Sequence, residues 1–238
     1  MNIEQEQFRV GAIQPIELFK ETWQLIKDEY WLIFAITLLG MVVASLVPIV
    51  LIGPMMCGIY MALLAKIDGG KADLQLLFKG FDRFLPSLLL TIIIVGPFFV
   101  MLLGIYIPII AMALAGERMS QEELLIFIGI LIAVELVLGI IMVGLHSLLI
   151  FAYPLIAEHK LTAMQAIRLS SRASWQNLGG ITGLIAVAFG LTILGYLMLC
   201  VGIYLVLPLI MAATAVAYRK VFPLETQRFG ESVSSFGR

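Results

Sequence analysis

Long apolar runs make up most of the chain and alternate with shorter segments of mixed polarity. Each run is long enough for a transmembrane helix, because about 20 apolar residues cross the hydrocarbon core of a bilayer. The first run is interrupted at Val47-Pro48 and the last near Cys200-Val201-Gly202, so each of these two holds two spans. We therefore predict six transmembrane helices. The runs are Trp31–Ala65, Leu85–Ala115, Leu124–Ala157 and Ile181–Tyr218.

A segment of alternating polarity precedes each pair of predicted spans. The three segments are PIELFKETWQLIKDEYW, KADLQLLFKGFDRF and LTAMQAIRLSSRASW, and Thr162 is placed to cap the third. Spacings of three and four residues predict amphipathic helices that lie in the membrane interface. One interpretation is that these helices brace the bundle. The alternative is that they bind lipid headgroups or a partner protein. The apolar residues of the first segment are Ile16, Phe19, Trp23 and Ile26.

The order of one amphipathic helix and two spans occurs three times, in units of about 15–66, 71–158 and 161–221. Internal repeats occur in transporters and also in proteins that grew by duplication. We predict an all-α polytopic membrane protein of three hairpins, with a single domain at 1–223 and a polar tail at 224–238. The second span of each unit carries a proline that is expected to kink its helix. These prolines are Pro54, Pro154 and Pro208.

Charge is scarce and unevenly placed. Only 13% of the residues are charged and 61% are hydrophobic, whereas soluble domains contain about 25% charged residues. All of the 15 lysines and arginines except Arg118 lie on one side of the predicted spans, which predicts cytoplasmic N- and C-termini. The net charge of −1 provides no basic field, so we expect no nucleic-acid partner. The acidic N-terminus, MNIEQEQFRV, does not resemble a cleavable signal peptide.

The sequence contains no catalytic or cofactor motif, because it lacks a Gly-rich phosphate loop, HExxH and GxSxG. Cys57 and Cys200 lie in apolar runs and are interpreted as small packing residues. His159, at a membrane edge, is interpreted as interfacial polarity. A metal site assembled from His146, Glu135 and sulfur-bearing neighbours has no supporting motif. We therefore expect no enzymatic activity, no metal and no cofactor.

Two ionisable residues, Glu135 and His146, stand inside the apolar stretch AVELVLGIIMVGLHSLLIF. On an α-helix they align within about 20°, and Tyr153 lies near the same direction, as do Gly139 and Met142. Ionisable groups inside a membrane are functional candidates by default, so one interpretation is a proton or solute path along this face. The other is a structural hydrogen bond from His146 to a neighbouring span. Its candidate partners are Tyr196, Thr192 and Tyr204.

Depth separates Glu135 from His146. If the cytoplasmic boundary lies at Glu158, about 20 residues of helix reach back only to about Leu138. His146 then lies near the bilayer midplane, and Glu135 lies at or beyond the outer interface. The same count leaves the apolar segments IYIPIIAMALA and LLIFIGILIAV beyond the interface. Such a surface must be covered by a partner, return into the membrane, or belong to tilted helices.

Three segments carry a family resemblance: GPMMCGIYMALLAKIDGGKADLQLLFKGFDRF, LHSLLIFAYPLIAEHKLTAMQAIRLSSRASWQNLGGITGLI and LTILGYLMLCVGIYLVLPLIMAATAVAYRKVF. They resemble a group of bacterial inner-membrane proteins of unknown function, related to the membrane domain beside glycerophosphodiester phosphodiesterases. The resemblance covers nearly the whole chain. It implies a six-helix fold in the bacterial inner membrane with cytoplasmic termini, and it brings no activity, cofactor or catalytic residue. We expect the chain to lack the catalytic domain of the phosphodiesterase.

The segment from Gly104 to about Val137 departs from this group, whose members usually link spans three and four by a short Pro-Gly turn. Here the segment is expanded and contains GERMSQEE. We therefore expect an integral membrane scaffold or accessory subunit that uses this extended hairpin to bind another membrane protein or a second copy, in addition to membrane lipids. The alternative is a transporter or channel for a small or lipid-like solute that uses the Glu135, His146 and Tyr153 face.

Overall fold

The structure, a computed structural model, describes residues 8–115, 120–198 and 201–224. These residues form helices and contain no strand, which confirms the all-α prediction. The α-helices are α1 Pro15–Ile26, α2 Tyr30–Leu46, α3 Ile52–Ile67, α4 Leu74–Lys79, α5 Phe84–Ala115, α6 Gln121–Leu148, α7 Ala152–His159, α8 Ala163–Gln176, α9 Leu178–Leu197 and α10 Val201–Val221. Two 3₁₀ segments, η2 Lys27–Glu29 and η3 Gly80–Arg83, lead into α2 and α5.

Five helical stretches within the described residues are long and apolar enough to cross a membrane, which supports a multi-pass membrane protein. A sixth apolar helix, α3, is shorter, with 16 residues. It corresponds to the second predicted span, so the prediction of six spans depends on whether α3 crosses the bilayer. The five stretches are Pro15–Leu46, Leu74–Ile110, Gln121–His159, Leu178–Leu197 and Val201–Val221.

Two of the amphipathic segments show how the sequence sets their helices. On α1, Phe19 and Ile26 point in one direction and are buried, whereas Ile16 and Trp23 point about 60° away and are exposed. The predicted apolar face therefore divides into a stripe that packs on the bundle and a stripe on the surface. Helix α8 begins at the predicted N-cap, because the Thr162 hydroxyl accepts a hydrogen bond from the N–H of Gln165.

Helix α3 lies at the centre of the bundle, where it contacts α2, α4, α5, α7 and α10. Glycine permits the closest of these approaches. A Cβ on Gly58 would lie 1.9 Å from the carbonyl oxygen of Leu77, and a Cβ on Gly80 would lie 1.9 Å from that of Pro54. The backbones of α3 and of the α4–η3 segment therefore touch directly, which a larger residue at either position prevents.

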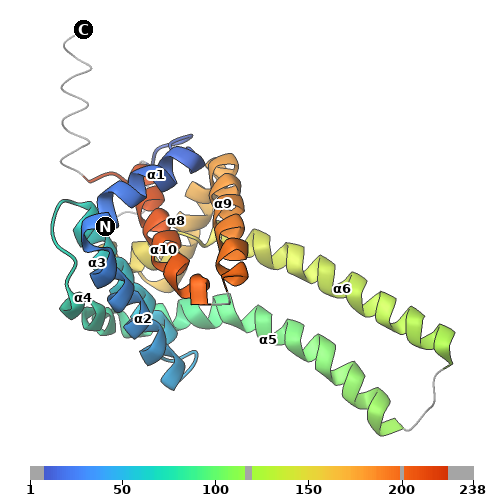
Figure 1. The fold of residues 1–238 in the computed structure, drawn as a ribbon. Coiled ribbons are helices and arrows are strands. Elements are labelled where there is room, and N and C mark those ends of the chain that lie inside the picture. The colour runs from blue at the N-terminus through green and yellow to red at the C-terminus, as the bar shows by residue number, and fades with distance from the viewer. Residues whose placement is uncertain (1–7, 116–119, 199–200, 225–238) are drawn as a thin grey trace.

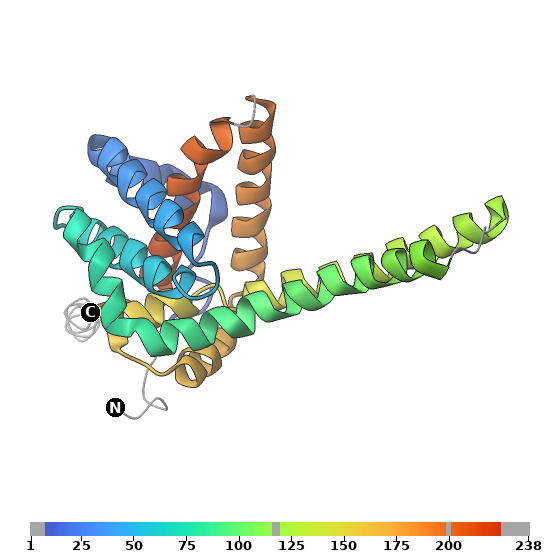
Figure 2. The same ribbon diagram turned by 90° about the horizontal axis from the view of Figure 1, so that it is seen from below.

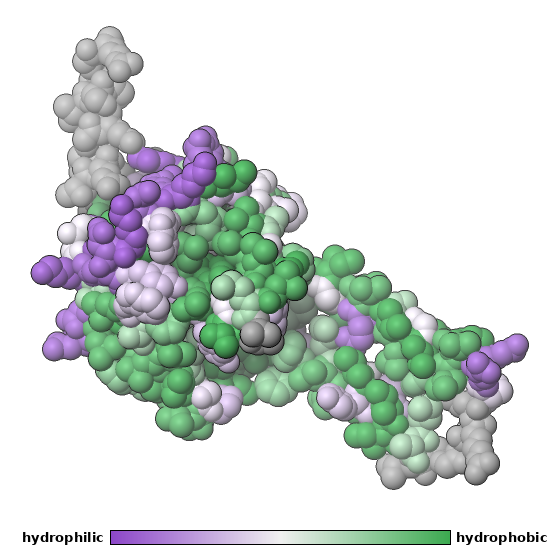
Figure 3. Space-filling model, in the orientation of Figure 1, coloured by the Kyte–Doolittle hydropathy of each residue, from purple (hydrophilic) through white to green (hydrophobic). Residues whose placement is uncertain are grey.

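Helices α5 and α6 form a hairpin that extends away from the bundle (Figures 1 and 2). The first turns of α5 are anchored in the bundle, where Ser87, Leu90, Thr91 and Ile94 are buried. Beyond Ile94, none of the α5 side chains that the structure describes is buried. None of the side chains of α6, all of which are described, is buried either. Apolar surface runs along the hairpin, and hydrophilic surface gathers over α1 and at the far end of the hairpin (Figure 3).

The structure corrects the basis of the depth prediction. That prediction counted one continuous helix back from Glu158, but α6 ends at Leu148 and α7 begins at Ala152. From Ala152 to Ala157 every side chain of α7 is buried in the bundle. The count of apolar residues along the hairpin therefore starts at the end of α6, and Glu135 lies near the middle of that helix instead of at its outer limit.

The three predicted kink prolines occupy different positions. Pro54 is the third residue of α3 and Pro154 the third residue of α7, so both lie in a first turn, where a missing N–H leaves no helical hydrogen bond unmade. Pro208 lies inside α10, as predicted. Cys57 is buried among core residues, whereas Cys200, the tail from 225 onward and Arg118 lie outside the described residues.

Candidate functional site

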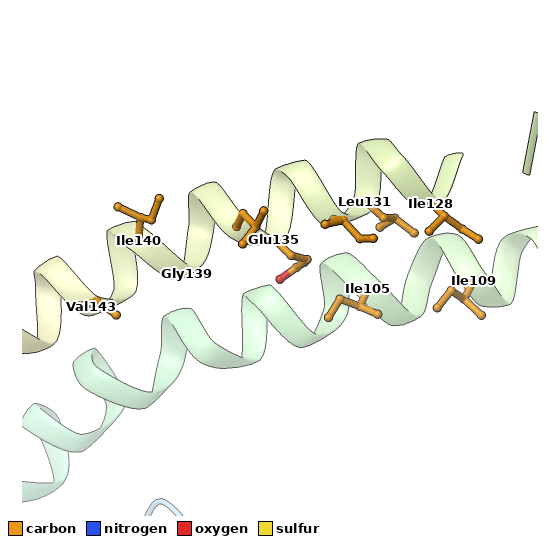
Figure 4. Close-up of a pocket in the computed structure, with 10 residues that line it drawn as sticks. Ile105, Ile109, Ile128, Leu131, Glu135, Gly139, Ile140 and Val143 are labelled. Atoms are coloured by element: carbon orange, nitrogen blue, oxygen red, sulfur yellow. The ribbon is translucent and has the colours of Figure 1, made fainter. Parts of the chain in front are cut away.

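The hairpin contains an apolar groove of about 800 Å³ between α5 and α6. Ile105 and Ile109 of α5 form one side of it. The other side consists of α6 residues that recur at helical spacing and are apolar apart from one glutamate (Figure 4). These α6 residues are Ile128, Leu131, Ile132, Glu135, Leu136, Gly139, Ile140 and Val143.

The side chain of Glu135 extends from α6 toward α5, into the space between the two helices (Figure 4). Gly104 of α5 lies opposite, and a Cβ built on it would be 3.4 Å from the Glu135 Oε1 atom. Both carboxyl oxygens of Glu135 are buried, and neither has a hydrogen-bond partner among the described residues. The absence of a side chain at Gly104 therefore provides room for the carboxyl, but α5 offers it no donor.

An unpartnered carboxylate in apolar surroundings is unfavourable. Its desolvation is not compensated, and a charged group in the centre of a transmembrane helix costs about 2.5–3.5 kcal/mol by insertion measurements. Lipid chains carry no donor and cannot reduce this cost. The described residues provide Glu135 with no hydrogen-bond donor that would offset this cost.

His146 and Tyr153 line a second cavity, of about 530 Å³, at the base of the hairpin. The side chain of His146 is exposed, and no hydrogen bond joins it to another described residue. The predicted structural bond to Tyr196, Thr192 or Tyr204 is therefore not formed, and the Thr192 hydroxyl instead donates to the Ala188 carbonyl of its own helix.

Tyr153 is buried, and its hydroxyl lies 2.9 Å from the Thr91 Oγ1 atom. Thr91 already donates its proton to the Ser87 carbonyl at 2.8 Å, so Tyr153 is the donor in the pair. This bond joins α7 to the anchored part of α5. Tyr153 therefore has a defined structural partner at the position where sequence analysis placed a functional candidate.

The predicted face of the fourth span is divided between these two cavities. Glu135 lines the groove, and His146 lies about 16 Å further along α6, in the second cavity. Val143 lines both, so the cavities adjoin. Tyr153 reaches the second cavity from α7, so the single continuous helix assumed in the prediction does not explain its position.

Sequence analysis missed an ion cluster at the ends of α3, α7 and α10. Arg219 donates to Asp68 at 2.7 Å and to Glu158 at 2.9 Å. Glu158 also accepts the hydroxyl proton of Tyr218 and lies 3.4 Å from His159 Nε2, which gives the predicted interfacial histidine an acidic neighbour. Burial raises the pKa of the Asp68 carboxyl, and the nearby Arg219 guanidinium opposes this shift. The only signal in the sequence is that each of these charges stands where an apolar run ends.

No group of three or more histidine, cysteine or acidic residues within the described part of the chain could hold a metal ion. Comparisons of the chain with protein-family models, with curated proteins and with solved structures each found no match.

Proposed function

We propose that the protein is an integral membrane scaffold or accessory subunit that binds another membrane protein through the α5–α6 hairpin. The observation that carries this proposal is the unpartnered Glu135 carboxyl in an otherwise apolar groove of the hairpin. Lipid chains are sufficient to cover the apolar side chains of the arm, but they cannot pair with the carboxyl. A protein partner can do both.

The dimensions of the hairpin suit a membrane location. Helix α5 has 32 residues and α6 has 28, which correspond to about 48 and 42 Å. Each exceeds the hydrocarbon core of about 30 Å, and the part of α5 beyond Ile94 is about as long as that core. The most apolar window of the Gln121–His159 stretch contains no buried residue, so this surface faces lipid or protein.

The proposal includes the topology that the cations predict. Lys20 and Lys66 lie on the side assigned to the cytoplasm, together with the arginine of the ion cluster, Arg219. The family resemblance implies a location in the bacterial inner membrane, and the extended hairpin is the feature by which this chain differs from the resembling group.

Site-specific crosslinking in native membranes tests the proposal. A benzophenone is attached to a single cysteine at Ile107 or Ile140, both exposed on the hairpin, with Cys200 replaced by serine and the buried Cys57 retained. We expect crosslinks to a second membrane protein. Phe189, exposed on α9, is the control position and should yield lipid adducts. Lipid adducts alone at both hairpin positions would contradict the proposal.

The alternative function, transport of a small or lipid-like solute, is favoured by the cavity that His146 shares with Tyr153. His146 is exposed, lines this cavity and has no hydrogen-bond partner among the described side chains, so its imidazole is free to contact a solute there. Proton uptake into vesicles, followed with an enclosed pH-sensitive dye, tests this function. Wild-type flux that persists in His146→Ala would remove the main reason for it.

A further inference from the structure

We infer that the groove between α5 and α6 binds a transmembrane helix of a different membrane protein, and that this helix carries a lysine or arginine in its apolar middle whose cationic group pairs with the carboxylate of Glu135. This inference rests on the proposed function and specifies the chemistry of the partner. It starts from the two buried carboxyl oxygens that have no partner among the described residues.

Charge complementarity favours a cation over other donors. A carboxylate accepts up to four hydrogen bonds, and a bond to an ionised donor is about twice as strong as one between neutral groups. In a membrane, each of the two charges is unfavourable alone, and such charges pair with one another. The groove that Glu135 lines has a volume of about 800 Å³, which is enough to hold a long side chain.

A second copy of the chain cannot supply this cation from its spans. Between Phe84 and Leu148 the sequence has one lysine or arginine, Arg118, which is outside the described residues. Helices α2 and α9 have none. The cations of α3 and α10 stand at helix ends, and each has an acidic partner within the chain. They are Lys66, Arg219 and Lys220, bound to Glu29, to Asp68 and Glu158, and to Glu21.

A lipid amine is also a poor match. Glu135 is about 20 Å along α6 from either end of that helix. Headgroup amines lie at the interface, about 15 Å from the centre of a hydrocarbon core of about 30 Å. Reaching the carboxyl would draw the whole headgroup into hydrocarbon. A lysine or arginine on a helix already stands at that depth.

Gly104 leaves room for the Glu135 carboxyl between the two helices. A side chain on this residue would point at Glu135, since even a Cβ would lie 3.4 Å from Oε1. The next groove residue on α5, Ile105, is apolar and leaves the carboxyl without a competing donor. The pair of Gly104 and Glu135 therefore presents one acceptor in an otherwise apolar groove, and this selects for a helix with one central donor.

The test uses the full chain in phosphatidylcholine vesicles and synthetic transmembrane peptides. Each peptide is a leucine–alanine helix of about 24 residues with lysine, leucine or glutamate at its centre. A fluorescent donor on a cysteine at Ile107, with Cys200 replaced by serine, reports binding of an acceptor-labelled peptide. We expect the central-lysine peptide to bind about tenfold more tightly than the central-leucine peptide.

Three variants make the measurement specific. Glu135→Gln keeps the shape of the side chain and removes its charge. The roughly tenfold difference in affinity between the lysine and leucine peptides should therefore be mostly lost. Gly104→Leu fills the space beside the carboxyl and should weaken binding of the lysine peptide without changing any charge. Glu122→Gln removes an exposed carboxylate at the start of α6 and should leave the preference intact. Circular dichroism and gel filtration confirm that each variant is folded.

Several results would overturn the inference. Equal binding of the lysine and leucine peptides would exclude pairing with Glu135, yet it would leave a docking hairpin in place if crosslinks form at Ile107 and Ile140 in native membranes. A lysine preference that persists in Glu135→Gln would also exclude it. Two labelled copies that show energy transfer to each other, and whose association displaces the peptide, would identify a second copy as the occupant. Loss of the preference when phosphatidylethanolamine is added would identify a lipid amine.

Discussion

Arg219 on α10 and Asp68, just beyond the end of α3, form an ion pair with a distance of 2.7 Å between Nη2 and Oδ2. The two residues are 151 positions apart in the sequence. The same guanidinium binds Glu158 of α7 at 2.9 Å, so one buried side chain joins the ends of three elements. In the chain, the α5–α6 hairpin follows η3 and precedes α7. Since Glu158 of α7 belongs to the cluster, the cluster holds together the part of the bundle from which the hairpin projects.

Replacing the central cation should destabilise the bundle. Arg219→Met keeps much of the apolar volume but removes the guanidinium that pairs with the partly buried carboxylates of Asp68 and Glu158. We expect a loss of about 2–3 kcal/mol in unfolding free energy, measured as a lower Tm in detergent. Lys220→Met, one residue further, breaks a more exposed pair with Glu21 and should cost under about 1 kcal/mol. Equal losses in the two variants would contradict a central role for Arg219.

Asp68 should also affect how stability depends on pH. Burial raises the pKa of its carboxyl in the folded chain, so the folded state binds this proton more tightly than the unfolded state. The resulting stabilisation is present below the unfolded pKa and is lost as pH rises through the raised value. Asp68→Asn cannot titrate. The Tm of the wild type minus that of Asp68→Asn should therefore increase as pH falls from neutral to acidic. A difference that decreases would contradict the sign of the shift.

The contact between α3 and α4 predicts a severe effect of a single methyl group. In Gly58→Ala the new Cβ would meet the Leu77 carbonyl oxygen at 1.9 Å, so the two backbones must separate. We expect a loss of at least about 3 kcal/mol in unfolding free energy or failure to fold. Gly144→Ala on α6 is the matched control, because nothing lies within 4 Å of its new Cβ. Alanine has a higher helix propensity than glycine, so the Tm of Gly144→Ala should be unchanged or slightly raised.

The helices were largely predictable because their causes are local. Apolar length, the spacing of Phe19 and Ile26, and the capping hydroxyl of Thr162 act within a few residues, so the sequence alone indicates them. The break between Leu148 and Ala152 was not predicted. Ser170 on α8 holds this turn by donating to the Leu148 carbonyl and accepting the Phe151 N–H. That contact depends on how α8 folds back, which no local pattern specifies.

The candidate site was predictable only as a set of residues. Helical spacing predicted that Glu135 and His146 share one face of a helix, and in the structure they line two adjoining cavities. It could not indicate that Gly104 stands opposite Glu135, because the angle between two helices of a hairpin depends on packing at its base. For the same reason, the ion cluster of Arg219 became visible only when the ends of α3, α7 and α10 were brought together.

The bond between Tyr153 and Thr91 should stabilise the base of the hairpin. Tyr153→Phe removes a buried donor and Thr91→Val removes its acceptor, and each should lower the unfolding free energy by about 1 kcal/mol. Because both remove the same bond, the double variant should lose less than the sum of the single losses, with a coupling of at least about 0.5 kcal/mol. Tm values of the wild type, the two single variants and the double variant in detergent provide this double-mutant cycle. The control is Tyr204→Phe, at an exposed residue, which should leave Tm unchanged. Strictly additive losses would show that this bond does not hold α7 against α5, and the cavity at His146 would then lack a fixed wall.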